Sequence, residues 1–226
     1  MAVFQAIADG VWTSNVEVSL RKVMRIPATM TVLALPNNEL LLHSPVPMTD
    51  ERKAEVDALG RVTHLYSPNA VHHLSIGFWS EAYPHARVHA SKALAKKRPE
   101  LRIDRFQDTP EPAFKGVIDE VHVDSFKTFE TAVLHRPSKT LVLADLVQNM
   151  VPSHWFTRLY ATLSGVNGKV AVLGPIKKSG FSDHKAMKKH LEQILSFDFD
   201  RIIVGHGTVI TENPKEQLSR AYEWLR

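Results

Sequence analysis

The sequence contains no cysteine, and this absence removes several classes of protein at once. Disulfide-stabilised folds, thiolate nucleophiles and cysteine-ligated zinc sites all require the thiol. Long apolar runs are also missing, since no stretch approaches the roughly 18 residues that a membrane span needs. The opening stretch MAVFQAIADGVWT lacks the basic segment and apolar core of a secretory leader. We therefore expect a cytoplasmic protein in which any metal is held by histidine and carboxylate.

Positively charged residues are only slightly in excess. Lysine and arginine number 28 against 24 aspartate and glutamate, which gives a net charge of +4. The basic residues gather in residues 92–102 and 177–189, where solvated helix faces are the simplest interpretation and docking of an anionic substrate or nucleic acid is the alternative. Because no nucleic-acid-binding motif with interleaved aromatic residues accompanies them, we expect a small-molecule substrate, no nucleic acid and no membrane partner. A homodimer stays open.

The composition and patterning indicate one ordinary globular α/β domain over residues 1–226. Hydrophobic residues make up 44% and charged residues 23% of the chain, enough to bury a core. Residues 36–38, Pro-Asn-Asn, lie between apolar runs and predict a β-hairpin. Thr49 and Gly60 bracket a predicted helix over 50–59. Further strands are predicted at 11–18, 29–35, 39–43, 61–67, 86–90, 117–123, 130–135, 140–144 and 201–204. Further helices are predicted at 77–83 and 91–97, from a cap at Ser182 or Asp183 to Ile194, and after a cap at Asn213.

Three places put a metal-competent polar residue directly after an apolar strand. They are the loop Asn69 to His73, Asp145 after TLVLA, and His206 after RIIVG. Strand ends are where ligands converge in layered α/β folds. Neutral imidazole and carboxylate are suitable ligands for borderline divalent ions. The three strand ends therefore predict one shared site.

This order of parts resembles the metallo-β-lactamase superfamily. Its elements are a first hairpin, a strand leading into a histidine-rich loop, a later hairpin ending in Asp145, and a last strand ending in Gly205-His206-Gly207. The resemblance spans nearly the whole chain. It implies a four-layer αβ/βα sandwich with two mixed β-sheets, helices outside, and a pocket where strand ends meet.

The sequence also departs from that family in ways that matter for the metal. In place of His-x-His-x-Asp-His it reads Pro-Asn-Ala-Val-His-His over residues 68–73, and the stretch DSFKTFE at 124–130 lacks the family's further histidine. His43 replaces the usual aspartate of the early strand. By motif position, the resemblance maps His73 and His72 onto the second-site histidine and aspartate, Asp145 onto the bridge and His206 onto the final ligand. This pattern implies a degenerate branch that keeps one metal position.

The resemblance and the retained ligands favour a metal-dependent hydrolase of an ester, lactone, thioester or phosphoester. One divalent ion, zinc or alternatively iron, would be held by His72, His73, Asp145 and His206 and would activate a water, with Asp145 and His73 as the catalytic residues. Two alternatives stay open: an iron-bound redox protein on the same fold, and a binding or scaffold protein in which these residues hold no metal.

Other polar residues have a structural interpretation beside the functional one. Asn69 and His154 are candidate substrate-binding residues, but Asn69 also suits a turn and His154 an ordinary amphipathic helix. Ser44 follows His43, and this pair resembles a nucleophile and its base. Because neighbouring residues of a strand face opposite ways, we expect a structural hydrogen bond there instead.

Overall fold

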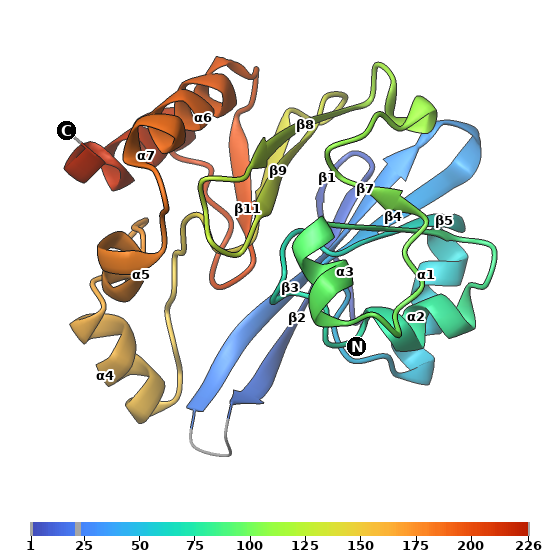
Figure 1. The fold of residues 1–226 in the computed structure, drawn as a ribbon. Coiled ribbons are helices and arrows are strands. Elements are labelled where there is room, and N and C mark those ends of the chain that lie inside the picture. The colour runs from blue at the N-terminus through green and yellow to red at the C-terminus, as the bar shows by residue number, and fades with distance from the viewer. Residues whose placement is uncertain (1, 21–23, 226) are drawn as a thin grey trace.

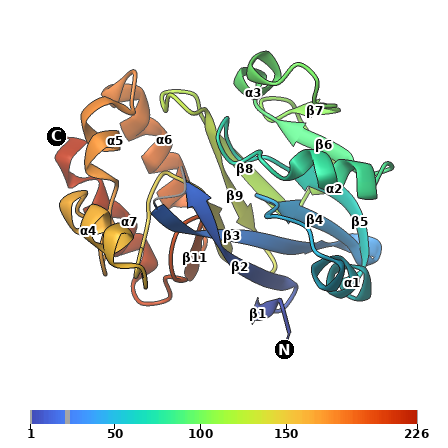
Figure 2. The same cartoon turned by 90° about the horizontal axis from the view of Figure 1, so that it is seen from below.

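The computed structural model describes residues 2–20 and 24–225 of the chain. Two β-sheets pack face to face, and helices cover both outer faces (Figure 1). The layers follow one another as helices, sheet, sheet and helices (Figure 2). This arrangement confirms the predicted four-layer αβ/βα sandwich with two mixed sheets.

The first sheet holds strands β1 to β7 in chain order. Its first four strands are antiparallel, and from β4 onward the neighbours are parallel. The strands are β1 (Gln5–Ala8), β2 (Val11–Leu20), β3 (Met24–Leu35), β4 (Glu39–His43), β5 (Arg61–Tyr66), β6 (Arg87–Ala90) and β7 (Arg105–Phe106). The second sheet has the order β11-β10-β9-β8, in which only β10 and β11 are parallel. Its strands are β8 (Ile118–Val123), β9 (Glu130–His135), β10 (Thr140–Leu143) and β11 (Arg201–Val204).

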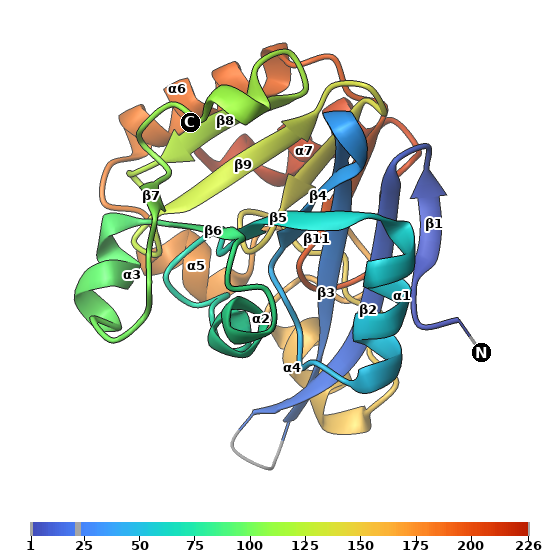
Figure 3. The same cartoon turned by 90° about the vertical axis from the view of Figure 1, so that its right-hand side faces the viewer.

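Seven α-helices occur among the described residues, divided between the two outer faces. Figure 3 looks onto the face of the first sheet that carries α1 (Asp50–Leu59), α2 (Ile76–Ala82) and α3 (Lys92–Lys97). The opposite side carries α4 (Trp155–Leu163), α5 (Gly174–Ser179), α6 (His184–Ser196) and α7 (Pro214–Ala221). None of these described helices is long and apolar enough to cross a bilayer.

Alternation along the strands builds three apolar layers between the four structural ones. Leu40 and Leu42 of β4 pack in the cluster that contains residues of α1 and α2, whereas Leu41 packs between the sheets. In β11, Ile203 joins the cluster between the sheets, and its neighbour Ile202 packs under α6 and α7. Side chains of a strand point alternately to its two faces, so each sheet can be buried on both.

The predicted hairpin lies between β3 and β4, and its turn has the expected chemistry. Asn37 and Asn38 have φ values of 62° and 58°, a left-handed conformation that asparagine tolerates better than most residues. The predicted helix over 50–59 is also confirmed. The Thr49 side chain caps it by accepting a hydrogen bond from the Arg52 backbone N–H, and it ends at Gly60.

The fold brings four strand ends to one region. β4 and β5 are parallel neighbours in the first sheet, and β10 and β11 are parallel neighbours in the second. Their carboxyl ends lead into Ser44, the 69–73 loop, Asp145 and His206. Because the two sheets face each other, these segments can contribute side chains to one site.

Candidate metal centre

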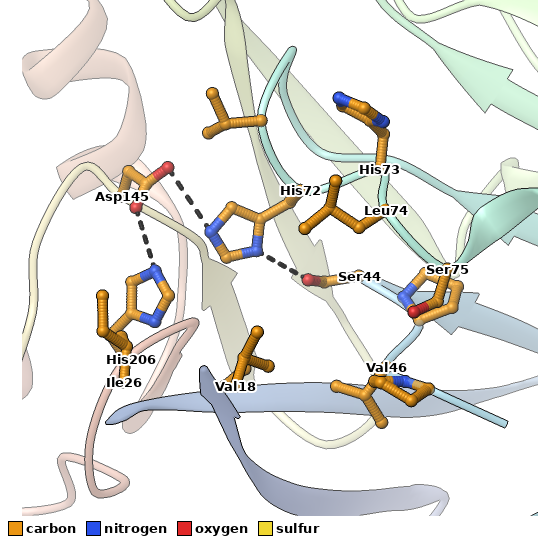
Figure 4. Close-up of a pocket in the computed structure, with 14 residues that line it drawn as sticks. Val18, Ile26, Ser44, Val46, His72, His73, Leu74, Ser75, Asp145 and His206 are labelled. Carbon is orange, nitrogen blue, oxygen red and sulfur yellow. Dashed lines mark hydrogen bonds and ion pairs between the residues drawn. The ribbon is translucent and has the colours of Figure 1, made fainter. Parts of the chain in front are cut away.

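His72, Asp145 and His206 meet as a compact cluster in which the carboxylate lies between the two rings. His72 Nε2 lies 3.4 Å from Asp145 Oδ2, and His206 Nε2 lies 3.3 Å from Asp145 Oδ1. Figure 4 shows both rings turned toward the carboxylate. Of the residues predicted as metal ligands, the structure therefore brings these three together.

Glu130 holds the loop that carries Asp145. The backbone N–H groups of Ala144, Asp145 and Leu146 donate to its carboxylate over 2.8, 2.7 and 3.3 Å. Glu130 has no exposed surface. Sequence reasoning missed this residue, although an acidic residue at the start of the apolar strand ETAVLH was a usable signal. Its role is to fix the backbone at the end of β10.

Asn69 links the 69–73 loop to the loop that carries Asp145. Its Oδ1 accepts from the backbone N–H groups of Val71 and His72, both over 2.9 Å. Its Nδ2 donates to Asp145 Oδ2 over 2.9 Å and to Glu130 Oε2 over 3.1 Å. Asn69 is fully buried, and these contacts use both ends of its amide. It shapes the turn and bridges two carboxylates, which corresponds to the structural interpretation.

The electrostatics of the cluster follow from burial and charge. Burial opposes ionisation of Asp145, but His72 and His206 hold the pKa of this carboxyl well below its usual range. Burial likewise disfavours a charged His206, yet its hydrogen bond to Asp145 raises the pKa of this ring. Burial and the charge of Asp145 raise the pKa of Glu130 to about 7. Two buried acids at one site favour a positive charge between the rings and Asp145.

The tautomer of His206 requires positive charge between its ring and Asp145. Its Nδ1 lies 2.6 Å from the carbonyl oxygen of Pro27, which can only accept, so Nδ1 carries a proton. In a neutral ring, Nε2 then directs a lone pair at Asp145 Oδ1. Two acceptors facing each other require a positive partner, either a second proton on the ring or a metal ion.

The distances leave room for a metal ion as that partner. Charge-assisted N–H···O bonds are usually about 2.7–2.9 Å long, shorter than the 3.3 and 3.4 Å found here. Two ligand atoms that each lie about 2.1 Å from a tetrahedral zinc ion are separated by about 3.4 Å. The donor set of two imidazoles and one carboxylate therefore suits a divalent cation.

Ser44 orients His72 from the opposite side of the ring. Its Oγ lies 2.7 Å from His72 Nδ1 (Figure 4). Ser44 has a φ of 54°, which directs it away from the alternation of β4, and its backbone N–H donates to Tyr66 O. The expected structural hydrogen bond thus exists, but its partner is His72 and not His43. A hydroxyl that accepts from Nδ1–H leaves the Nε2 lone pair free for a metal.

We predict that Ser44→Ala and Ser44→Gly both weaken zinc binding by about 10- to 100-fold, the usual effect of losing an outer partner of a ligand. Glycine relieves the positive φ, so Ser44→Gly should be more stable than Ser44→Ala by about 1 kcal/mol. Titration of zinc against a competing chelator measures the affinity. Ser75→Ala is the control, because Ser75 lines the same cavity. Wild-type affinity in either Ser44 variant would contradict the assigned role.

His73 and His154 are not brought to the cluster. The His73 ring points away from Asp145 (Figure 4), and its Nδ1 lies 3.1 Å from Arg98 Nη1. Adjacent loop residues project in different directions, so His72 and His73 cannot both reach one ion here. His154 precedes α4 and contacts Trp155; it is absent from the described residues that line the cavity beside the cluster.

A second group of metal-competent side chains lies buried at the first sheet: His64 of β5, His89 of β6 and Glu111 of the connector after β7. His64 Nδ1 and His89 Nε2 hydrogen-bond directly over 2.8 Å. Arg87 donates to Glu111 over 2.7 Å, and Arg105 Nη1 lies 3.2 Å from His89 Nδ1. Burial lowers the pKa of His89 to about 2. Two guanidinium groups already occupy these acceptors and repel a cation, so this group is a structural network.

The arrangement of layers and the position of the cluster define the metallo-β-lactamase fold. No protein-family model matches the sequence, and a search of curated proteins finds no significant match. Solved structures do match. A metallo-β-lactamase from Erythrobacter litoralis is 14% identical with a TM-score of 0.68, and the match covers 98% of this chain and 96% of that one.

Two other solved structures have the same fold. The metallo-β-lactamase FIM-1 from Pseudomonas aeruginosa, in its mono-zinc form, is 11% identical with a TM-score of 0.66, covering 98% of this chain and 94% of that one. The flavodiiron core Flv1 from Synechocystis is 10% identical with a TM-score of 0.66, covering 98% of this chain and 60% of that one. At these identities the likeness shows the fold alone.

Proposed function

We propose that this protein is a hydrolase that uses one divalent cation, held by His72, Asp145 and His206, to cleave a small carbonyl- or phosphoryl-containing substrate in the cytoplasm. The observation that carries the proposal is the forced Nδ1 proton of His206, which aims its other nitrogen at Asp145. The fold, which metal-dependent hydrolases share, is consistent with it. Zinc is the proposed ion, because two histidines and one carboxylate with an open position are typical of catalytic zinc.

The residues around the proposed ion would have distinct roles. A bound divalent ion supplies a water of lowered pKa and polarises the scissile bond. His72 and His206 orient their Nε2 atoms, Asp145 provides the negative charge, and Ser44 fixes the His72 ring. Glu130 holds the Asp145 backbone in place before any ligand arrives. Such a preformed site avoids reorganisation during the reaction.

An iron-bound redox protein is the second candidate. The likeness to a flavodiiron core favours it, and histidine with carboxylate also suits non-haem iron. A scaffold without metal is the third. The three candidates predict bound zinc, bound iron and no bound metal, respectively. The metal content of the purified protein therefore distinguishes them before any substrate is known.

The test is elemental analysis of the protein purified without chelator, followed by an ester-hydrolysis assay. About one equivalent of zinc per chain is expected, with hydrolysis that is lost on dialysis against a chelator and restored by zinc. Stoichiometric iron would favour the redox candidate. Protein that stays metal-free after growth in zinc and iron, or hydrolysis that survives the chelator, would contradict the proposal.

A further inference from the structure

The cavity next to the metal centre is lined mostly by apolar side chains. It has a volume of about 360 Å³ and contains His72, Asp145 and His206 in its wall. Apolar lining comes from three separate segments: the β2–β3 hairpin, the 44–47 loop and the 69–75 loop. Pockets of this size take small organic ligands. The polar cluster is thus one part of a cavity whose remaining wall is mostly apolar.

The β2–β3 hairpin supplies a fixed apolar wall beside the cluster. Val18 of β2 pairs with Ile26 of β3 in the antiparallel register. In the view of Figure 4, Val18 lies below His72 and Ile26 overlaps His206. Ala28 shares a face of β3 with Ile26, because alternate residues of a strand project to the same side. This wall lies on a strand pair, so its shape is set before a ligand binds.

The opposite wall comes from the loops that follow β4 and β5. Val46, Val71 and Leu74 line the cavity there. Leu74 and Val71 are 69% and 43% exposed, which leaves apolar surface in water at this end of the cavity. Burying such surface against a ligand is favourable in proportion to the area removed from water.

Charge within the cavity disfavours an anionic ligand tail. Among the described lining residues there is no lysine or arginine, and Asp145 is the carboxylate. Glu130 lies directly behind Asp145. A carboxylate or phosphate placed along the apolar wall would lose hydration and gain no positive partner. A neutral apolar chain meets neither penalty.

We propose that this cavity selects the acyl part of the substrate, and that this part is a neutral, apolar chain. The substrate class is then a carboxylic ester, thioester or lactone with an alkyl acyl group, whose carbonyl lies at the metal centre and whose chain lies against Val18 and Ile26. The position of the carbonyl rests on the proposed function. The position of the apolar chain rests on the residues that line the cavity alone.

In the binding test, the protein as purified is titrated with alkan-2-ones from butan-2-one to octan-2-one. Protein-detected NMR measures the dissociation constant of each ketone. Each added methylene should tighten binding about three- to fourfold, as expected for complete burial of a CH₂ group. 7-Oxooctanoate, which is octan-2-one with a carboxylate at the far end of its chain, should bind more weakly than octan-2-one. A dissociation constant that does not change with chain length, or 7-oxooctanoate binding as tightly as the ketone, would overturn the inference.

A pair of variants localises the effect. Ile26→Asp should remove most of the gain per methylene, because it places a charge in the apolar wall. Leu163→Asp is the matched control, since Leu163 is 81% exposed on α4 and lies outside the described lining. An unchanged ketone series in Ile26→Asp would place the chain elsewhere and refute the assignment.

The ketones contain no hydrolysable bond, so this test is independent of the proposed reaction. A steep series on inactive, metal-free protein would support the apolar cavity and contradict the hydrolase. Ketone affinity that does not change with chain length, measured on an active zinc enzyme, would support the hydrolase and contradict the apolar cavity. In active enzyme, kcat/KM for p-nitrophenyl alkanoates should rise with acyl length in parallel with ketone affinity, and a fall with acyl length would count against the inference.

Discussion

Asp145→Asn is expected to abolish stoichiometric metal binding while leaving the fold intact. The substitution keeps the size of the side chain but removes the negative charge that lies between His72 Nε2 and His206 Nε2. Zinc affinity should fall by more than about 100-fold, which is the upper end of the effect of losing an outer partner alone. Elemental analysis after gel filtration gives the stoichiometry, and competition with a chromogenic chelator gives the affinity. Circular dichroism confirms that the variant is folded.

His73→Ala is the matched control for Asp145→Asn. His73 lies next to a proposed ligand in the sequence, but its Nδ1 faces Arg98 instead of the cluster. The variant should keep about one equivalent of zinc, whereas His72→Ala should lose it. If His73→Ala lost the metal and His72→Ala retained it, the assignment of ligands would be reversed. Stoichiometric zinc in Asp145→Asn would rule out this carboxylate as a ligand.

The architecture was predictable because it depends on short-range patterns that the fold must satisfy. The Pro-Asn-Asn turn, the cap at Thr49 and the apolar runs of β4, β10 and β11 each follow from local chemistry. Strand ends in this fold converge, so the order of polar residues after those runs placed Asp145 and His206 in one region. The boundaries differ by a few residues: β3, for example, begins at Met24 and not at Thr29.

The site itself was predictable only in part, since its details depend on directions that a sequence does not encode. His72 and His73 are adjacent, and which of them turns toward Asp145 is decided by the Asn69 turn and by Arg98. Ser44 reaches His72 through a positive φ that breaks the alternation of its strand. Glu130 is unusual as an acidic residue at the start of an apolar strand, but its partners become evident only when the backbone at the end of β10 is placed beside it.

Glu130→Ala is expected to destabilise the protein by about 3–6 kcal/mol. Three buried backbone N–H groups lose their acceptor, and each unsatisfied donor costs about 1–3 kcal/mol. The loss of repulsion with Asp145 acts in the opposite direction, but it is one interaction against three. Urea unfolding followed by fluorescence measures the change. Because natural proteins are stable by only about 5–15 kcal/mol, poor soluble yield is also an expected result.

Two further variants keep this prediction testable if Glu130→Ala does not fold. Glu130→Gln retains one carbonyl acceptor, so its unfolding midpoint should lie between those of the wild type and the alanine variant. Glu55→Ala is the control, since Glu55 also accepts from two backbone N–H groups, those of Val3 and Phe4, but does so near the surface. Water can replace a lost acceptor there, so its effect should be much smaller. A Glu130→Ala protein as stable as the wild type would show that relief of the Asp145 repulsion balances the three lost hydrogen bonds.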